Sequence, residues 1–195
     1  KPNDLYKDGL QRDQFLPFIS IIKKNSFHKE LLINLDYRRS SFNKLQRAFY
    51  PLNERTSFTI NQLFRELTKN KTSKILKLDI KGREFIIKKF YDGVVKFDFN
   101  DLCNANLGAE DYINVANTCK FIVIKNIPIF NDQNANQQNR FITLIDILYD
   151  KKILLMISMA SSLENIGSSQ TLVQPFKRTL SRLFELTSSK TSLFK

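Results

Sequence analysis

The chain has 195 residues, which is enough for one domain or one and a half. Hydrophobic residues make up 42% and charged residues 26%, with five Gly and five Pro, so the composition is that of a globular protein and argues against disorder. Lys and Arg number 31 against 19 acidic residues, and the net charge of +12 favours polyanions such as nucleic acid, anionic lipid or phosphate-bearing ligands. The basic residues are scattered and form no compact block, so a solvated Lys-rich surface is the simpler interpretation.

Cysteine and histidine are scarce. Cys103 and Cys119 are not at CxxC spacing, and with the single His28 they cannot supply the four ligands of a zinc site. His28 lies in a polar stretch and is expected at the surface. The longest apolar run, around residues 153–160, is far shorter than the roughly 18–20 residues that cross a bilayer. A start without Met indicates a processed or truncated chain.

Hydrophobic periodicity predicts the elements in chain order. The first helix is marked by apolar residues at helical spacing, namely Phe15, Phe18, Ile19 and Ile22. Pro17 predicts an early break or kink in it. A short strand is predicted at residues 31–35, and a helix at 58–67 with Ser57 or Thr56 as its cap.

A β-hairpin is predicted next, because residues 75–80 alternate apolar and polar, Gly82 supplies a turn and residues 84–90 return. A strand at 94–99 and a small helix capped by Asn100 follow. Two further helices are predicted, at 109–118 and from Pro175 to about Ser188.

The most regular stretch predicts a parallel sheet. Residues 121–124 are a continuous apolar run, as expected of a strand buried on both faces. A polar loop at 131–139 leads to a helix at 140–149 and a second buried strand at 153–157. Strand, helix and strand in this order form a βαβ unit, so the fold class is α/β.

No complete active site is visible in the sequence. There is no GxxxxGK[ST] loop to cradle phosphates, and the buried strand ends in Lys125-Asn126 instead of paired acids for magnesium. Asp146 and Asp150 stand at i, i+4 spacing on one helix face, which is common for solvated pairs.

Three arginines remain as candidates for phosphate chemistry. Arg12 lies among apolar anchors, and Arg178 and Arg182 lie four apart on one face of the last helix. A rigidly held guanidinium stabilises phosphoryl charge through planar, bidentate hydrogen bonds. The alternative for each is a helix-surface arginine paired with a nearby acid, such as Asp8, Asp13 or Glu185.

Five sequence blocks, in order, carry a resemblance to a known family. They are residues 1–12 with 15–19, Asp36-Tyr37-Arg38, residues 97–103 with 107–112, residues 140–146 with 149–150, and residues 176–185. Together they cover nearly the whole chain and resemble the ZapE family, which comprises bacterial ZapE and the mitochondrial AFG-one-like ATPases, including lactation-elevated protein. The sequence departs from the family pattern at residues 119–121, 158–161 and 185–186, which concerns local packing.

The resemblance implies the C-terminal part of a AAA+ ATPase that works as a homo-oligomeric ring. It implies ATP and Mg²⁺ as cofactors, protein substrates that are remodelled, extracted or degraded, and no specific nucleic acid partner. For a mitochondrial member it implies a location on the matrix side of the inner membrane and respiratory-chain proteins as substrates. Walker A, Walker B and sensor 1 lie upstream of the resembled part, so this chain alone is expected to be inactive. Arg12 then takes the place of an arginine finger, and Arg178 or Arg182 that of sensor 2.

The resemblance also suggests three parts. Residues 1–40 would be the post-sensor-1 helix and strand that close the AAA+ core, 41–92 a helix plus hairpin insertion, and 93–195 a family-specific βαβ region with the C-terminal helix. The sheet would complete a core whose other strands are missing and would expose an unpaired edge.

Two other functions stay open. The first is a self-sufficient basic module that binds nucleic acid or anionic membrane without catalysis; the lack of an aromatic-plus-basic motif counts against it, as do 17 Phe residues that sit mainly in apolar periodicities. The second is a pseudoenzyme or structural adaptor.

Overall fold

The computed structural model describes residues 12–26 and 47–188 of the chain. The chain divides into two compact units, Lys1–Asp36 and Tyr37–Lys195. The strand predicted at 31–35, His28 and the Asp36-Tyr37-Arg38 block lie outside the described residues.

The smaller unit contributes one described helix, α1 (Arg12–Asn25). Pro17 lies inside this helix, so the predicted break is wrong, and the kink named as its alternative stays a prediction. The proline is only the sixth helical residue, and its missing N–H removes a single hydrogen bond, to the carbonyl of Asp13 in the first turn. Phe15 and Phe18 pack with ring centroids 5.2 Å apart on this helix.

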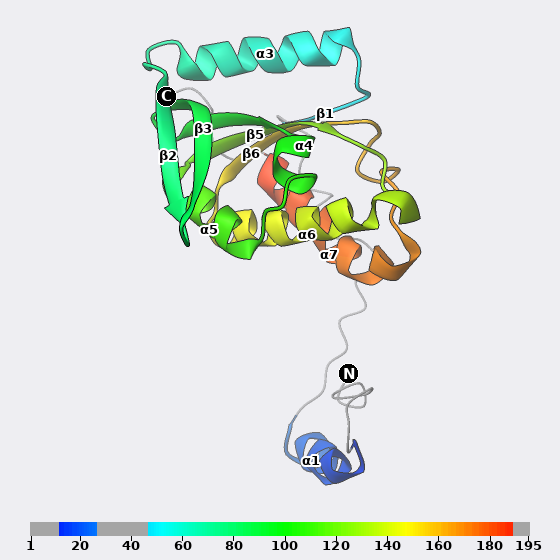
Figure 1. Ribbon diagram of the computed structural model, residues 1–195. Coiled ribbons are helices and arrows are strands. Elements are labelled where there is room, and N and C mark those ends of the chain that lie inside the picture. The colour runs from blue at the N-terminus through cyan, green and yellow to red at the C-terminus, as the bar shows by residue number, and fades with distance from the viewer. Residues whose placement is uncertain (1–11, 27–46, 189–195) are drawn as a thin grey trace. The chain divides into compact units, whose positions relative to one another are not determined.

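The larger unit is built on one six-stranded mixed sheet with the strand order β1-β6-β5-β4-β3-β2 (Figure 1). The strands are β1 (Ala48–Phe49), β2 (Lys74–Ile80), β3 (Arg83–Tyr91), β4 (Val94–Asp98), β5 (Phe121–Ile127) and β6 (Leu154–Met159). The four strands β1, β6, β5 and β4 are parallel, whereas β4, β3 and β2 are antiparallel. The predicted α/β fold with a parallel βαβ unit is therefore confirmed, and a second such unit joins β4 to β5.

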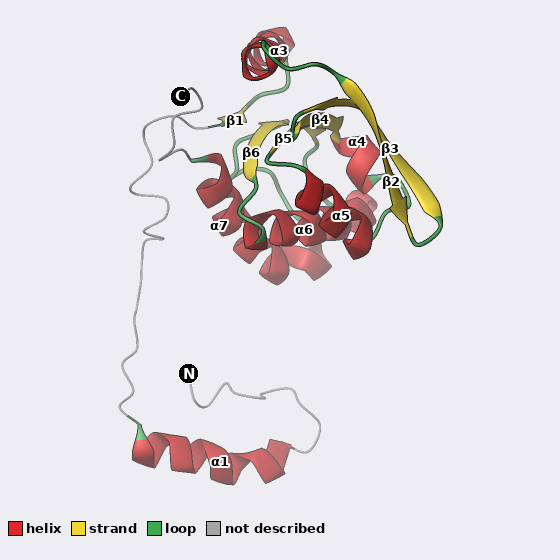
Figure 2. Cartoon of the chain, turned by 90° about the vertical axis from the view of Figure 1, so that its left-hand side faces the viewer, coloured by secondary structure: helices red, strands yellow, loops and turns green. Residues whose placement is uncertain are grey.

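The helices divide between the two faces of this sheet. They are α3 (Glu54–Thr68), α4 (Phe99–Cys103), α5 (Ala109–Thr118), α6 (Ala135–Asp150) and α7 (Val173–Thr187), with short 3-10 turns η2 (Asp132–Asn134) and η3 (Gln170–Leu172). Figures 1 and 2 show α3 alone on one face and α4 to α7 on the other, which gives three layers.

The central strands are apolar on both sides because both faces are covered. On β5, Ile122 and Ile124 belong to the core under α5 and α6, and Phe121 and Val123 belong to the smaller core under α3. The interior strand prediction for 121–124 is therefore confirmed. Alternate burial of this kind contributes about 1.5–3 kcal/mol for each large apolar side chain.

The predicted hairpin is also confirmed. Lys81 and Gly82 have φ values of 51° and 76°, the left-handed pair that a tight two-residue turn requires. The Gly82 N–H donates to Asp79 Oδ1 at 3.1 Å, which fixes the turn.

Helix starts were predicted less well. Asn53 caps α3 by accepting from the Thr56 N–H at 2.8 Å, and Asp98, not Asn100, caps α4. In both cases the helix begins earlier than the apolar pattern, because an Asn or Asp side chain was available upstream. The loop expected at 131–139 is also too long, since α6 already begins at Ala135.

A buried arginine joins the two ends of the larger described segment. Arg47 is 3% exposed, and its side chain donates to the carbonyls of Leu155 at 3.0 Å and Leu186 at 2.9 Å. Its own N–H donates to the carbonyl of Thr187 at 2.7 Å. Burial lowers the pKa of Arg47. A cation at the C-terminus of α7 meets the negative end of the helix dipole, which stabilises the charge there.

Candidate functional site

The topology points first to the carboxyl ends of β1 and β6. The chain leaves β1 toward α3 on one face and leaves β6 toward α7 on the other (Figure 2). In open α/β sheets, ligands bind outside the carboxyl ends of the strands at such a switch point.

A cavity of about 460 Å³ lies at this switch point. Its lining comes from β1, the following turn and the first residues of α3: Ala48, Phe49, Tyr50, Pro51, Asn53, Arg55, Thr56 and Thr59. The cradle of a P-loop ATPase presents successive backbone N–H groups from a glycine-rich turn to the phosphates. The turn here is Tyr50-Pro51-Leu52, which holds a proline without an N–H and no glycine. These residues do not fit the phosphates of ATP.

A hydrogen-bonded chain of polar side chains crosses the ends of the neighbouring strands. Asn126 Nδ2 donates to Asp98 Oδ2 on β4 at 2.6 Å, and the Asn126 N–H donates to Ser158 Oγ on β6 at 3.0 Å. Asn126 has a φ of 63° at a register shift in β5. These hydrogen bonds therefore tie the three parallel strands β4, β5 and β6 together at their carboxyl ends.

This edge does not fit a magnesium site. Asp98 is a single carboxylate that already caps α4, and the residue opposite it on β5 is Lys125. Within residues 12–26 and 47–188, no group of three or more His, Cys, Asp or Glu side chains is arranged to hold a metal ion.

The two sensor 2 candidates lie together, on the outer side of the α6–α7 pair. Arg178 Nη2 lies 2.8 Å from Asp146 Oδ2, and Arg182 Nη1 lies 2.5 Å from Asp146 Oδ1. The second contact meets the distance of an ion pair but not the hydrogen-bond angle. Arg182 also lies over the ring of Tyr149, 4.9 Å from its centroid, and 4.0 Å from Asp150. One aspartate on α6 thus holds both arginines of α7.

The exposed fractions separate the two arginines. The side chain of Arg182 is 20% exposed and that of Asp146 is 23% exposed, whereas Arg178 is 60% exposed. Arg182 is therefore a packed residue of the helix pair, and Arg178 is the one with its guanidinium largely in solvent. Asp146 lies near the end of α6, which leads into the amino end of β6, so this cluster sits away from the carboxyl edge.

The cluster was partly visible in the sequence. Two acids at i, i+4 on α6 and two arginines at i, i+4 on α7 are complementary, but the partner expected from sequence was Glu185, whose Oε2 instead accepts from the Tyr149 hydroxyl at 2.8 Å. The sequence pattern does not single out Arg140, whose side chain donates to the Cys103 carbonyl at 3.2 Å and joins α6 to α4. Three of the five blocks that carry the family resemblance therefore meet at α6, since α4, α5 and α7 all pack against it.

Arg12, the finger candidate, is the first residue of α1 in the other compact unit. The structure therefore brings Arg178 and Arg182 together on Asp146, and Arg12 belongs to a different body of the chain.

The two thiols are structural. Cys103 and Cys119 are both buried and free. Burial raises the pKa of each thiol to about 12, although Arg140 opposes the rise at Cys103. A thiol with such a pKa is protonated at neutral pH and is a poor nucleophile.

The fold and these sites define a three-layer α/β domain with a mixed sheet, which presents clustered arginines on its α6–α7 helix pair. A family model described as AFG1-like ATPase matches residues 1–192. The chain therefore belongs to the AFG1-like ATPase family, as the sequence resemblance predicted.

Individual relatives agree with this assignment. Lactation elevated protein 1 homolog B of Danio rerio is 31% identical over 168 residues, which are 85% of this chain and 33% of that protein. Cell division protein ZapE of Escherichia coli (strain K12) is 27% identical over 189 residues, 97% of this chain and 50% of that protein. An uncharacterised protein of Schizosaccharomyces pombe is 29% identical over 171 residues, 85% of this chain and 37% of that protein. No solved structure matches the chain.

The chain spans between a third and a half of the length of these curated relatives. None of the described helices is long and apolar enough to cross a membrane.

Proposed function

We propose that this chain is the energy-coupling part of a AAA+ ATPase whose phosphate and magnesium ligands come from elsewhere in the longer protein. The observation that carries the proposal is the pairing of a family match over residues 1–192 with a switch-point turn that cannot cradle phosphates. In this role the chain supplies arginines to a nucleotide site whose other ligands lie elsewhere in the longer protein.

The proposal assigns Arg12 the role of the arginine finger. Arg12 is the first residue of α1, at the positive end of the helix dipole. A residue that reaches a neighbouring subunit's nucleotide acts in the transition state and not in binding.

The test is Arg12→Ala in the longer protein that carries the Walker segments, with Lys23→Ala on the same helix as the control. ATP turnover should fall by about 10³-fold or more, while nucleotide binding survives. Turnover within a few fold of the unchanged protein would remove Arg12 from the site.

Arg178 and Arg182 are the proposed sensor 2 pair, and their different exposure divides the work. The largely solvated Arg178 would reach nucleotide, with Arg182 and Asp146 holding the α6–α7 frame behind it. Arg178→Ala in the longer protein is then expected to weaken nucleotide binding or turnover with little change in thermal stability. A loss of stability without any change in nucleotide response would assign Arg178 to the frame alone.

Ring assembly, protein substrates and a mitochondrial location on the matrix side of the inner membrane belong to the same proposal. Family membership supports the ATPase part of this proposal, and the bacterial relative carries the name of a cell division protein. The substrates proposed are membrane-associated respiratory-chain proteins. Fractionation of tagged full-length protein, followed by cross-linking, tests location and ring formation; a cytosolic monomer would contradict both.

A further inference from the structure

The sheet opens between β3 and β4. These antiparallel strands are paired only at Phe90–Val95 and Tyr91–Val94. Beyond those pairs, β3 continues its pairing with β2 down to Arg83, and β4 continues its pairing with β5 up to Asp98. Two strand edges therefore face each other without a ladder between them, one along residues 85–89 and the other along 96–98.

The opening forms a crevice of about 660 Å³. It is lined by β3, by β4 and by α4: Phe85, Ile86, Ile87, Lys88, Lys89, Lys96, Phe97, Asn100, Asp101, Asn104 and Ala105. A smaller hollow of about 360 Å³ adjoins it under α3 and shares Lys89 and Lys96 in its lining. Along β3 the lining places three apolar side chains, residues 85–87, beside the two lysines Lys88 and Lys89.

A bulge turns two lysines toward one side of β3. Lys74 pairs with Phe90 and Leu76 with Ile87, so Lys88 and Lys89 together stand opposite the single residue Ile75. Two residues opposing one in this way lose the strict alternation of a strand, which brings both side chains to the crevice. Both line it.

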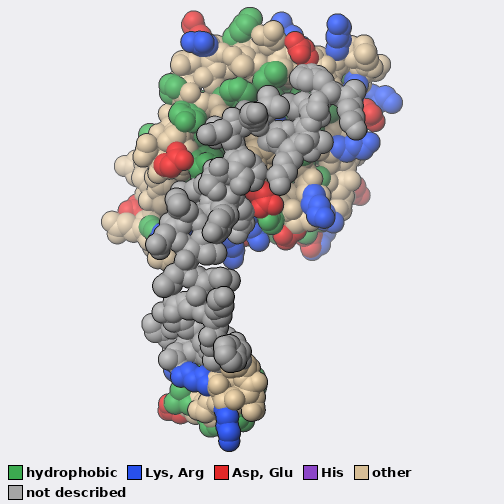
Figure 3. Space-filling model, turned by 180° about the vertical axis from the view of Figure 1, so that it is seen from behind, with side chains coloured by type: hydrophobic (Ala, Val, Ile, Leu, Met, Phe, Trp, Pro, Cys, Tyr) green, Lys and Arg blue, Asp and Glu red, His purple; other side chains and the backbone are tan. Residues whose placement is uncertain are grey.

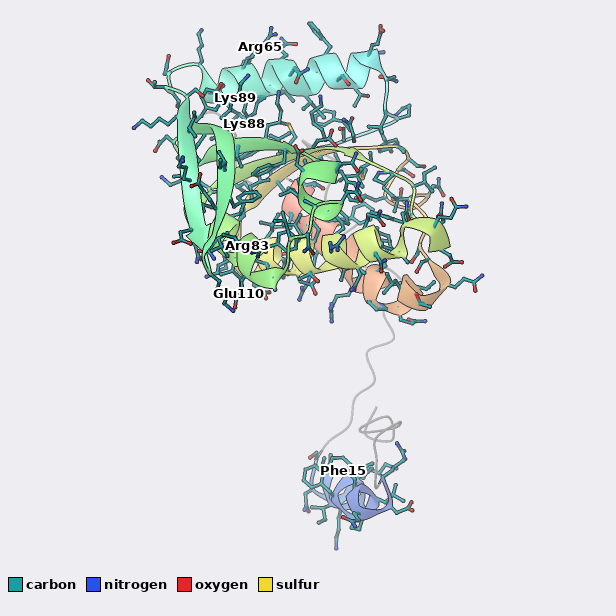
Figure 4. The ribbon with its side chains drawn as sticks, viewed as in Figure 1. Phe15, Arg65, Arg83, Lys88, Lys89 and Glu110 are labelled. Atoms are coloured by element: carbon teal, nitrogen blue, oxygen red, sulfur yellow. The ribbon has the colours of Figure 1, made fainter. Side chains whose placement is uncertain are left out.

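The cations here lack acidic partners among the residues that the structure describes. Figure 4 labels Arg65 on α3 and Lys88 and Lys89 on β3. Arg65 lines the same hollow as Lys89, and no ion pair with a described acid forms at any of the three. At the far tip of the same hairpin the pattern is the opposite: Lys81 pairs with Glu110, and Arg83 with Asp111 at 3.1 Å. The hairpin is thus neutralised at its tip and left positive at its base.

Lys96 lies at the centre of this positive cluster. Burial and then the charges of Lys125, Lys89 and Arg65 lower its pKa, so the folded protein holds these cations against mutual repulsion. Its Nζ donates to Asn61 Oδ1 at 3.0 Å and lies 4.7 Å from the Phe64 ring centroid. The acid in the crevice lining, Asp101, already accepts the Asp98 N–H through Oδ2 at 3.0 Å. An arriving anion would relieve the repulsion.

We infer that this crevice binds an extended, acidic segment of a partner protein. Its backbone adds hydrogen bonds to the open edges of β3 and β4, as in β-strand addition, and its alternate carboxylates contact Lys88, Lys89 and Lys96. The apolar side chains between those carboxylates cover Phe85 and Ile86, the latter 47% exposed.

A nucleic acid fits this surface less well. Binding to single strands relies on aromatic faces free for base stacking. Here Tyr91 is engaged edge-on with Phe64 at 5.7 Å, and Phe97 is only 8% exposed. Open strand edges recognise a peptide backbone, which nucleic acids and lipids lack. The inference goes beyond the proposed ATPase role, because it requires neither nucleotide nor ring assembly.

The test measures binding of a fluorescent synthetic peptide of alternating Glu and Val to the full 195-residue chain by anisotropy. The variant is Lys88→Glu/Lys89→Glu, and the matched control is Lys24→Glu/Lys177→Glu, which changes the net charge equally at exposed positions elsewhere. The crevice variant should bind about tenfold or more weakly, and the control should stay within about twofold of the unchanged chain.

Hydrogen exchange supplies the second readout. Bound peptide should slow amide exchange at residues 85–89 and at Lys96 and Phe97, which surface charge attraction alone would not do. An alternating Lys-Val peptide, oligothymidine and phosphatidylserine vesicles are the comparison probes. The inference would be overturned by an equal loss of peptide affinity in the crevice variant and the control, or by unchanged amide exchange at the two strand edges. Tighter binding of oligothymidine or vesicles than of the Glu-Val peptide would also overturn it. Lys88→Ala/Lys89→Ala replaces the charge reversal if thermal unfolding shows that the latter misfolds.

Discussion

Asp146→Asn tests whether the arginine cluster holds the helix pair together. The change keeps the shape of the side chain and removes the charge that Arg178 and Arg182 share. The side chains of Asp146 and Arg182 are each about four-fifths buried. The energy of their contact is therefore expected to exceed the about 0.2–1 kcal/mol of an exposed ion pair. It should stay below the roughly 4 kcal/mol of two charges at 4 Å in an effective dielectric of 20. We take about 1–2 kcal/mol for it. The Arg178 contact is 60% exposed on the arginine side and adds a few tenths of a kcal/mol.

The expected total is about 2 kcal/mol of unfolding free energy. For a domain of this size, that amounts to a fall in Tm of about 4–8 °C. Denaturant unfolding of the chain by circular dichroism gives the free energy directly, and a double-mutant cycle with Arg182→Met and Arg178→Met separates the two pairs.

The cycle has a sharp expectation. Coupling of Asp146 to Arg182 should be about 1–2 kcal/mol, and coupling to Arg178 less than about 0.5 kcal/mol. Equal couplings, or none with Arg182, would show that burial does not set the strength of these contacts and would refute the frame role of Arg182.

Three further outcomes follow from single sites. Cys103 and Cys119, with thiol pKa values of about 12, should resist a thiol reagent at pH 8 in the folded chain and react at once in denaturant; labelling of the native chain would contradict their burial. Gly167→Ala should lower the free energy of unfolding by about 2–4 kcal/mol, because the added Cβ would lie 2.5 Å from the Phe130 carbonyl oxygen at a φ of +75°. Gly82→Ala has open space at a similar φ and should lower it by only about 1–2 kcal/mol, as measured by denaturant unfolding of both variants. Folding lowers the pKa of Lys96 from its ordinary value of 10.5. Between the folded and the unfolded pKa the unfolded chain binds more protons, so the free energy of unfolding rises with pH in that range. Lys96→Met should remove this rise, and an unchanged slope of stability against pH would contradict the repulsion.

The elements that sequence predicted best are those set by local pattern. The two-sided burial of β5 follows from a continuous apolar run, and the hairpin follows from alternation plus Gly82 at the turn. Each of these signals lies within a few residues of the feature it predicts.

What the sequence did not predict depends on partners far along the chain. Asp146 is an ordinary helix-surface acid until α7 packs beside it, and the separation of β3 from β4 has no local marker because each strand alone reads normally. Arg47 is similar: nothing near it in sequence indicates that its acceptors are carbonyls more than a hundred residues away, at separations of 108 and 139 positions. The cap errors at Asn53 and Asp98 have a simpler cause, since several polar residues competed for each cap.

The contacts of Arg47 also determine how this domain takes up mechanical load. They clamp the start of β1 to the last turn of α7, so force applied to the chain on either side of residues 47–188 acts on that seam first. Arg47 also donates to the Leu155 carbonyl on β6, so the same residue ties this seam to the parallel part of the sheet. A motor that pulls on this domain through its flanking segments would therefore work against one short, hydrogen-bonded clasp, and Arg47→Met should lower the unfolding force measured by single-molecule stretching.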